Sequence, residues 1–335
     1  MKRKIIKQGH NTLTITLPSK WVKQFNIKGG DEIDLIEKDN ALLITREKNI
    51  ENQSKEIDIS GIDIPSIWKY FMGVYREGYD EVKVKFDPNT KYESPYKFVT
   101  SHGVDRKYKK IRLHTSFELI QEISNRLIGF EIIEHHKDHC IIKDVSDISS
   151  KEFESSLRRI FLLIQQMGEE LVESIKTNNT KILEHTHDID INIDRFHDYC
   201  IRVLNKTGFK DVKKSHLFFS TIYILELIGD EFKNLSFHLT QDFAGKKLDN
   251  LKQLAEMILY QFNSYYDLFY KFRKEKIVEM SKRDMEIYFY LPKLYKKKPG
   301  KKSELTDDER EVFNHFRRIG KYINALLELR IEIEC

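Results

Sequence analysis

MKRKIIKQGHNTLTITLPSKWVKQF (Met1–Phe25) opens the chain and is far more basic than the remainder of the sequence. The first 28 residues contain seven Lys and Arg side chains and no Asp or Glu, whereas the whole 335-residue chain has a net charge of only +4. Two alternating runs, KIIKQG and LTITLP, flank a turn-forming segment at residues 9–11, which predicts a short antiparallel strand pair. Pro18 then favours a short helix that ends near Asn26.

The next residues predict a second hairpin, formed by EIDLIEK and ALLIT on either side of Asp39 and Asn40. We therefore place a first domain at residues 1–47, followed by the polar linker REKNIENQSK. A segment of this length has too few apolar side chains to bury a core by itself. Pairing with a second copy would remedy this, so the sequence predicts a homodimer.

The basic side chains of the first domain suit a polyanion, because neutralising phosphates releases their counterions. Asn and Thr side chains nearby could add hydrogen bonds to phosphates or bases. Lys-rich strand edges also deter aggregation, but the complete absence of acids favours a nucleic acid. The candidate DNA-binding residues are Lys2, Arg3, Lys4, Lys7, His10, Asn11, Thr12 and Lys20.

This segment resembles the AbrB/SpoVT/MazE-type DNA-binding domain. The resemblance rests on the basic strand, the turn GHNT and the runs LTITLPSKWV, FNIKGGDEIDL and NALLI. In that family, two chains exchange hairpins to form one dimeric barrel that presents basic loops to DNA. The resemblance therefore implies a small β-rich swapped-hairpin barrel and double-stranded DNA as a partner.

The rest of the chain divides into two regions by its hydrophobic period. Residues 56–147 alternate strand and helix patterns, which predicts a small α/β domain with a ferredoxin-like arrangement as one form. From residue 150 the period becomes 3.6, and six helical patterns fall near 151–178, 180–206, 212–241, 248–275, 278–291 and 304–332. Two sets of three predict an all-α duplicated three-helix bundle at 150–335, with repeats at about 150–242 and 246–335.

Two pairs of acids in this helical region are spaced for one helix face each. Asp190 and Asp194 are four residues apart, and so are Glu226 and Asp230. If their helices are neighbours, four carboxylates converge, which is costly unless cations or water neutralise them. Such oxygen ligands, with His187 as a nitrogen donor, suit a divalent or ferric ion. The alternative is a solvated acidic face.

The helical region resembles the PhoU family of phosphate-uptake regulators, particularly archaeal-type members that carry an AbrB-like segment in front. The matching motifs are DINIDRF (Asp190–Phe196) and LELIGDEFKNLS (Leu225–Ser236), although Leu227 stands where the family has Arg. In the second-repeat counterpart RRIGKYINAL, Arg317 and Lys321 replace the acids. The resemblance therefore implies a metal site in the first bundle only, and a phosphate transporter or signalling protein as a partner.

Other patterns exclude several classes of protein. Three isolated cysteines indicate a reducing cytoplasm, and no apolar run reaches the roughly 18 residues that span a bilayer. No phosphate-binding loop, HExxH or nucleophile motif is present. A di-iron oxidase needs two Glu-xx-His pairs, and only Glu184–His187 comes close. The Lys-rich stretch 293–302 indicates a solvated loop or a second phosphate-contacting patch.

These patterns together predict a cytoplasmic, non-enzymatic transcriptional regulator of phosphate homeostasis that is not embedded in a membrane. In the alternative, the N-terminal domain only dimerises and the helical region regulates a phosphate transporter or a metal-linked partner. A metal-dependent oxidase or hydrolase is a third reading.

Overall fold

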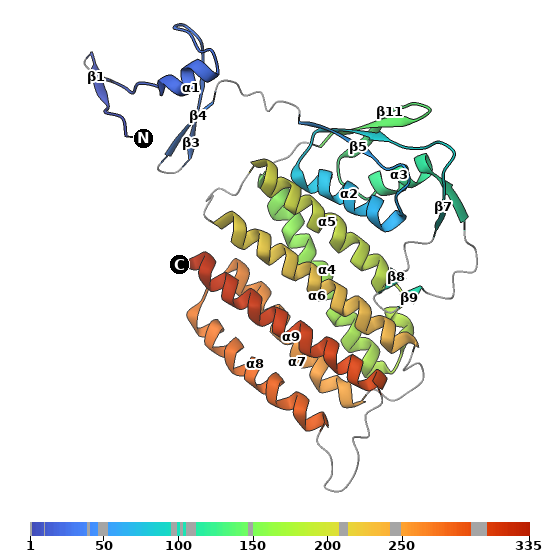
Figure 1. Cartoon of the computed structure of the whole chain (residues 1–335). Helices are drawn as coiled ribbons and strands as arrows, with labels where there is room; N and C mark the ends of the chain where they lie inside the picture. The colour runs from blue at the N-terminus through green and yellow to red at the C-terminus, as the bar shows by residue number, and fades with distance from the viewer. Residues whose placement is uncertain are drawn as a thin grey trace. The chain divides into compact units, whose positions relative to one another are not determined.

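The computed structural model describes residues 2–9, 11–38, 41–45, 53–94, 99–100, 103–104, 112–146, 150–207, 214–241, 249–295 and 307–335. It divides the chain into two compact units, residues 1–52 and residues 53–335, and both appear in Figure 1. A small β-rich region followed by a large, mainly helical region is the arrangement that the sequence predicts.

The N-terminal unit contains two short ribbons and one short helix. Its elements are β1 (Ile6–Gln8), β2 (Thr12–Thr14), α1 (Ser19–Gln24), β3 (Asp34–Lys38) and β4 (Ala41–Thr45). β1 pairs with β2 and β3 with β4, both antiparallel, as predicted. Gly9, with a φ of 73°, supplies the left-handed residue at the first turn. Among the described residues of one chain, the two ribbons do not join into a closed barrel.

The second unit begins with an α/β region. Its elements are β5 (Ser54–Asp58), α2 (Ile64–Glu77), β6 (Glu81–Lys85), β7 (Lys91–Ser94), β8 (Val99–Thr100), β9 (Gly103–Val104), β10 (Arg112–Thr115), α3 (Ser116–Ser124), β11 (Phe130–His135) and β12 (His139–Asp144). The main sheet has the order β11-β12-β6-β5, in which only β5 and β6 are parallel. Helices α2 and α3 bury their apolar faces in one core with this sheet.

Local signals explain where these helices begin. Asp63 caps α2 by accepting a hydrogen bond from the Ser66 backbone N–H at 3.0 Å, and Thr115 and Glu118 form a reciprocal capping box at α3.

The ferredoxin-like detail is not confirmed. That arrangement uses a split βαβ unit, whereas β5 and β6 are direct neighbours here.

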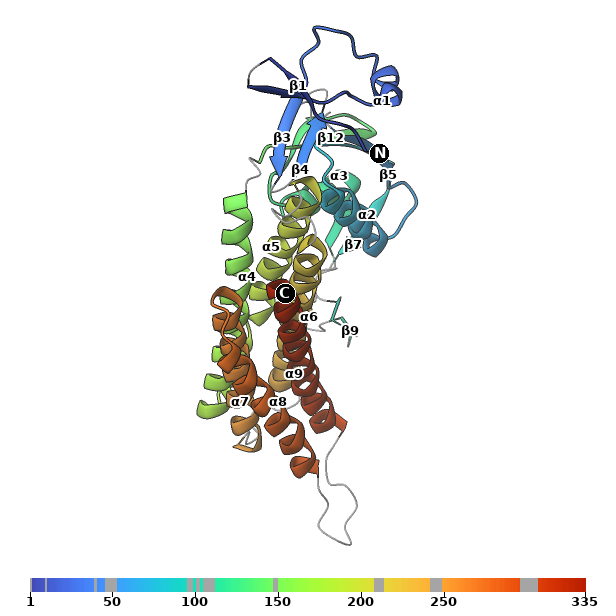
Figure 2. The ribbon, with the colours of Figure 1, turned by 90° about the vertical axis from the view of Figure 1, so that its left-hand side faces the viewer.

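Six long helices follow in the described part of the chain. They are α4 (Ser150–Thr177), α5 (Thr186–Thr207), α6 (Ser215–Gln241), α7 (Asp249–Tyr270), α8 (Lys274–Tyr295) and α9 (Asp307–Glu334), with a 3₁₀ turn at Thr180–Leu183. Figure 2 shows them running roughly side by side. Helices α4, α5 and α6 form one set and α7, α8 and α9 a second, joined through α4–α7 and α6–α9 contacts into one apolar core.

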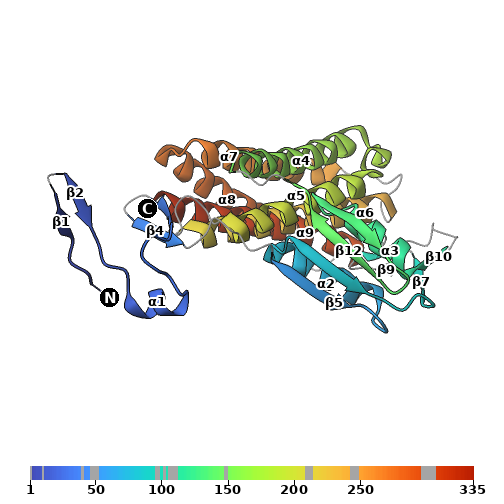
Figure 3. The same cartoon turned by 90° about the horizontal axis from the view of Figure 1, so that it is seen from above.

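Helix α2 packs on α5, on the side of the bundle away from α4 and α7 (Figure 3). Arg202 of α5 is the central polar link of this contact, and its side chain is fully buried. It donates hydrogen bonds to the Asp144 carboxylate at 2.6 Å and to the backbone carbonyls of Tyr75 at 2.6 Å and Tyr79 at 2.7 Å. One side chain therefore joins α2, the end of the sheet and α5.

Candidate functional sites

The predicted DNA-contacting residues lie on the surface of the N-terminal unit. Lys2, Arg3 and Lys4 precede β1, and Lys7 is in β1. Asn11 lies in the turn before β2, Thr12 begins β2, and Lys20 is in α1. All seven side chains are exposed. His10 lies outside the described residues. No lysine or arginine in residues 2–28 forms an ion pair with any described carboxylate, so the positive charge of this unit is not neutralised there.

The same unit also exposes its apolar side chains. None of its described side chains is buried, and Leu13, Leu35 and Leu42 are 67%, 61% and 63% exposed. Leu13 lies directly opposite Lys7 in the ribbon, so apolar and basic side chains share that face. A single copy therefore leaves apolar surface that a folded domain normally covers.

The second candidate is the carboxylate cluster between α5 and α6. Asp190 is only 3% exposed, and its Oδ2 accepts a hydrogen bond from the Lys233 ammonium at 2.8 Å. Lys233 also donates to Asp230. Asp194 accepts from Arg126 of the α/β region at 3.2 Å. The structure thus brings the acids of both helices together, around an ammonium group that the predicted ligand set does not contain.

Three carboxyl groups of this region, those of Asp190, Asp194 and Glu226, have raised pKa values. Burial, followed by the charges of Asp230 and Asp190, raises the pKa of Glu226 to about 7. Burial and the charge of Asp190 raise the pKa of Asp194 well above its ordinary value. Burial also raises the pKa of Asp190, against the opposing effect of Lys233. Burial is the largest cause for all three groups, and neighbouring carboxylates add to the shifts of all three.

The predicted metal ligands can be compared with this geometry. His187 is at the start of α5 and lies close enough to Asp190 to lower the pKa of that carboxyl, against the larger effect of burial. Within the described residues, no group of three or more His, Cys, Asp and Glu side chains has an arrangement that could hold a metal ion. Asp190 and Asp230 are instead occupied by the Lys233 ammonium. A metal at Asp190, Asp194, Glu226 and Asp230, with His187, stays a prediction.

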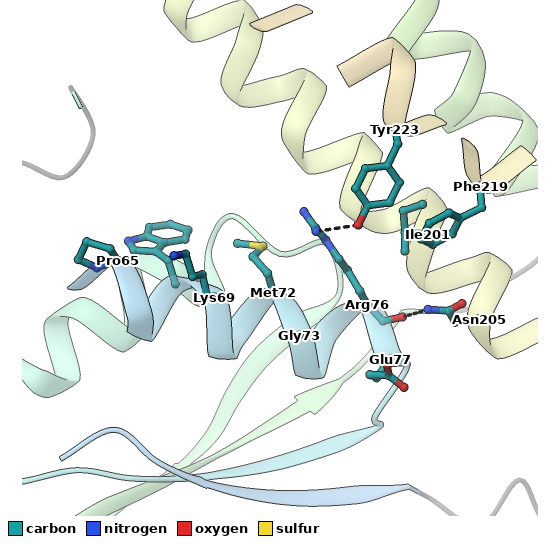
Figure 4. Close-up of a pocket in the computed structure, with 11 residues that line it drawn as sticks. Pro65, Lys69, Met72, Gly73, Arg76, Glu77, Ile201, Asn205, Phe219 and Tyr223 are labelled. Carbon is teal, nitrogen blue, oxygen red and sulfur yellow. Dashed lines mark hydrogen bonds between the residues drawn. The ribbon is translucent and has the colours of Figure 1, made fainter. Parts of the chain in front are cut away.

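A third feature is a hollow of about 510 Å³ between α2 and helices α5 and α6, shown in Figure 4. Among its lining residues, Arg76 donates hydrogen bonds to Asp198 at 2.7 Å and to the Tyr223 hydroxyl at 3.1 Å. Apolar walls come from Met72 and Phe219. Its volume lies in the range of small-molecule sites, and nothing in the sequence patterns indicated it.

Comparisons with known proteins agree with the N-terminal resemblance. Residues 6–52 match the family described as "Antidote-toxin recognition MazE, bacterial antitoxin", which confirms the AbrB/SpoVT/MazE-type resemblance of this segment. A search among curated proteins finds no match to the chain.

Among solved structures, the chain is similar to the crystal structure of the phosphate transport system regulatory protein PhoU from Streptococcus pneumoniae. The sequence identity is 18% and the TM-score is 0.45, over 55% of this chain and 94% of that chain. This likeness does not indicate what the chain binds. None of the described helices is long and apolar enough to cross a membrane.

Sequence reasoning missed Lys233, Arg126 and Arg76. Each is one charged residue among many on a helical pattern, and only the packing of separate segments brings it to its carboxylate partner. Lys233 alone had a signal, because it follows Asp230 by three residues on the same helix. The Lys-rich stretch 293–302 lies largely outside the described residues.

Proposed function

We propose that the chain is a DNA-binding transcriptional regulator and that the N-terminal units of two copies together contact double-stranded DNA. The observation that supports this most directly is the unneutralised positive charge of residues 2–28. The match of residues 6–52 to a MazE-type family agrees with it. The proposal places the protein in the cytoplasm and gives it no enzymatic role.

The proposal includes a homodimer, and the support for the homodimer is the exposure of apolar side chains in the N-terminal unit. Burying a leucine side chain is worth about 1.5–3 kcal/mol, and Leu13, Leu35 and Leu42 are each more than half exposed in the single chain. A second copy with the same surface could cover all three. The dimer would also double the positive charge on one small body, which strengthens the attraction to phosphates.

Binding of the full chain to a fluorescein-labelled DNA duplex, followed by anisotropy, tests the proposal. We expect Lys4→Gln/Lys7→Gln to weaken binding at least tenfold. The matched control Lys252→Gln/Lys271→Gln removes two exposed lysines from the bundle surface and should leave the affinity unchanged. Equal affinity of both double variants, or no binding by the unmodified chain, would contradict DNA binding.

We also propose that the helical region links the regulator to phosphate homeostasis. This rests on the PhoU-like motifs DINIDRF and LELIGDEFKNLS, which belong to α5 and α6, two helices in direct contact. In this proposal, a divalent or ferric ion binds Asp190, Asp194, Glu226 and Asp230, with His187 nearby. Such an ion would have to displace Lys233, which now bonds to two of these acids.

Elemental analysis of protein prepared without chelator tests the metal proposal. We expect Lys233→Gln to raise the metal content and Asp194→Asn/Asp230→Asn to abolish it. The same content in all three proteins would remove the site. If the chain also fails to bind DNA, the adaptor reading is preferred, in which the N-terminal unit only dimerises and the helices dock on a phosphate transporter.

A further inference from the structure

Strand β5 lies at the edge of the main sheet and pairs only with β6 in the described part of the chain. The Ile59 N–H, just after β5, donates to the Lys85 carbonyl of β6 at 2.9 Å. Because alternate residues of a strand direct their backbone groups to opposite sides, Glu56 and Asp58 turn theirs away from β6. These N–H and C=O groups can pair with another extended chain.

A groove of about 650 Å³ runs along this edge. One wall is formed by the consecutive residues 55–58 of β5. Neighbouring side chains of a strand point to opposite faces, so only a groove along the strand edge can touch all four. The other wall is one face of α2, including Tyr70, Gly73 and Val74. The five residues of β5 span about 17 Å, and residues 66–77 of α2 span about 16 Å.

Gly73 keeps the helix side of the groove open. It is exposed in the middle of α2, where glycine costs about 0.5–1 kcal/mol relative to alanine. Beyond the backbone of α2 itself, no described atom lies within 4 Å of the position that a Cβ would take, so no close packing against the described residues requires a glycine here. The open space is available to a bound chain.

Some of the charged side chains that line this groove already interact with other charged or polar groups of the chain, and others do not. Glu56 is held by Lys85 at 2.6 Å and Lys83 at 3.4 Å, and Asp58 accepts a hydrogen bond from the Ser60 backbone N–H at 2.9 Å. Lys85 also lies close enough to Asp58 to lower the pKa of that carboxyl, so Lys83 and Lys85 together offset the charges of these two carboxylates.

The two lysines that line the groove, Lys55 and Lys69, are not paired with described acids. Neither Lys55 nor Lys69 has an ion pair with a described carboxylate, and Lys55 lies 6.0 Å from the centre of the Tyr79 ring. Glu77 is the one remaining unengaged acid among the described lining residues. Two unpaired lysines thus face one unpaired glutamate, and this excess of positive charge favours acidic side chains on the bound chain.

A second copy of β5 does not fit this edge. An antiparallel two-fold pairing centred on Lys55, Glu56 or Ile57 would set Lys55 against Lys55, Glu56 against Glu56, or Glu56 against Asp58. Like charges directly opposite each other destabilise a strand pair, so each register is unfavourable.

We propose that this groove binds an acidic peptide segment of a partner protein, which adds to β5 as a fifth strand of the sheet. Backbone hydrogen bonds to Glu56 and Asp58 give the binding, and alternate side chains enter the space beside Gly73. Acidic side chains contact Lys55 and Lys69.

The test uses the full chain and a labelled hexapeptide that alternates glutamate and valine. Glu56→Pro removes the outward N–H without removing a bond to β6, because proline is tolerated at such edge positions. Glu56→Gln is the matched control, since it changes the side chain and keeps the N–H. We expect Glu56→Pro to weaken binding about three- to tenfold relative to Glu56→Gln.

Gly73→Leu provides an independent variant that leaves β5 untouched and improves helix propensity. It should also weaken binding by filling the groove, and a hexapeptide of lysine and valine should bind less well than the acidic probe. The proposal would be overturned if the unmodified chain did not bind the acidic probe or bound the basic probe more tightly. It would also be overturned if the two Glu56 variants bound the probe equally and Gly73→Leu left binding unaffected. A dimer that Glu56→Pro converts to monomer would overturn it as well, because a second copy would then be the occupant.

Discussion

Replacing Arg202 with methionine tests how the α/β region is attached to the bundle. The substitution keeps an apolar stem but removes the bond to Asp144 and the two bonds to backbone carbonyls. Asp144 is then left with a 3% exposed side chain and without its shortest cationic partner. Breaking a buried ion pair on one side costs about 3–5 kcal/mol.

The expected loss lies near the lower end of that range. Lys206 remains 3.2 Å from the Asp144 carboxylate, and the Ser146 backbone N–H donates to it at 3.0 Å. We therefore predict that Arg202→Met lowers the free energy of unfolding by about 3 kcal/mol. In the double variant Arg202→Met/Asp144→Asn no unpaired charge is left, so its loss should be smaller than the sum of the two single losses by about 1 kcal/mol or more.

Urea denaturation followed by circular dichroism measures these changes in the full chain. Arg159→Met is the matched control, because Arg159 is an exposed arginine on α4, and its effect should stay within about 0.5 kcal/mol. A loss below about 1 kcal/mol for Arg202→Met, or strictly additive effects of the two substitutions, would refute the central role of this ion pair.

Three further predictions concern single residues. The pKa of Glu226 is raised to about 7, so its protonated form favours the folded state. The free energy of unfolding should therefore fall by about 1–3 kcal/mol as pH rises from about 4.5 to about 7. Glu226→Gln should flatten this part of the pH profile measured by urea denaturation. Gly78→Ala should destabilise the protein more than Gly61→Ala. Both glycines have positive φ, but only at Gly78 would a Cβ meet Lys206, at 2.6 Å. Equal decreases in melting temperature for the two variants would disprove the contact. Leu13→Glu should convert the full chain from dimer to monomer in sedimentation velocity, and an unchanged dimer would place the interface elsewhere.

The helices could be predicted because their apolar period persists over many turns. The pattern at 151–178 corresponds to α4 (Ser150–Thr177), and the last pattern, 304–332, to α9 (Asp307–Glu334). The pattern at 248–275 was too long, since α7 ends at Tyr270; Phe272 continues the apolar spacing and hides the break. Helix ends depend on local backbone bonds that periodicity does not report.

The functional geometry was less accessible to sequence reasoning. The spacing of Asp190 and Asp194 predicted one helix face, and the structure indeed sets them beside Glu226 and Asp230. However, the groove between β5 and α2 depends on strand order, because the same residues in the middle of a sheet would offer no free edge. Strand order is a property of the whole fold, and no local pattern in residues 54–58 reveals it.

The salt dependence of DNA binding measures how many phosphates the paired N-terminal units contact. Each phosphate contact lowers the slope of log affinity against log salt concentration by about 0.9. If about five basic side chains of the paired N-terminal units contact the duplex, the slope should be about −4 or steeper, and Lys4→Gln/Lys7→Gln should make it shallower. A flat response of the full chain to salt, or no measurable binding at low salt, would contradict the account.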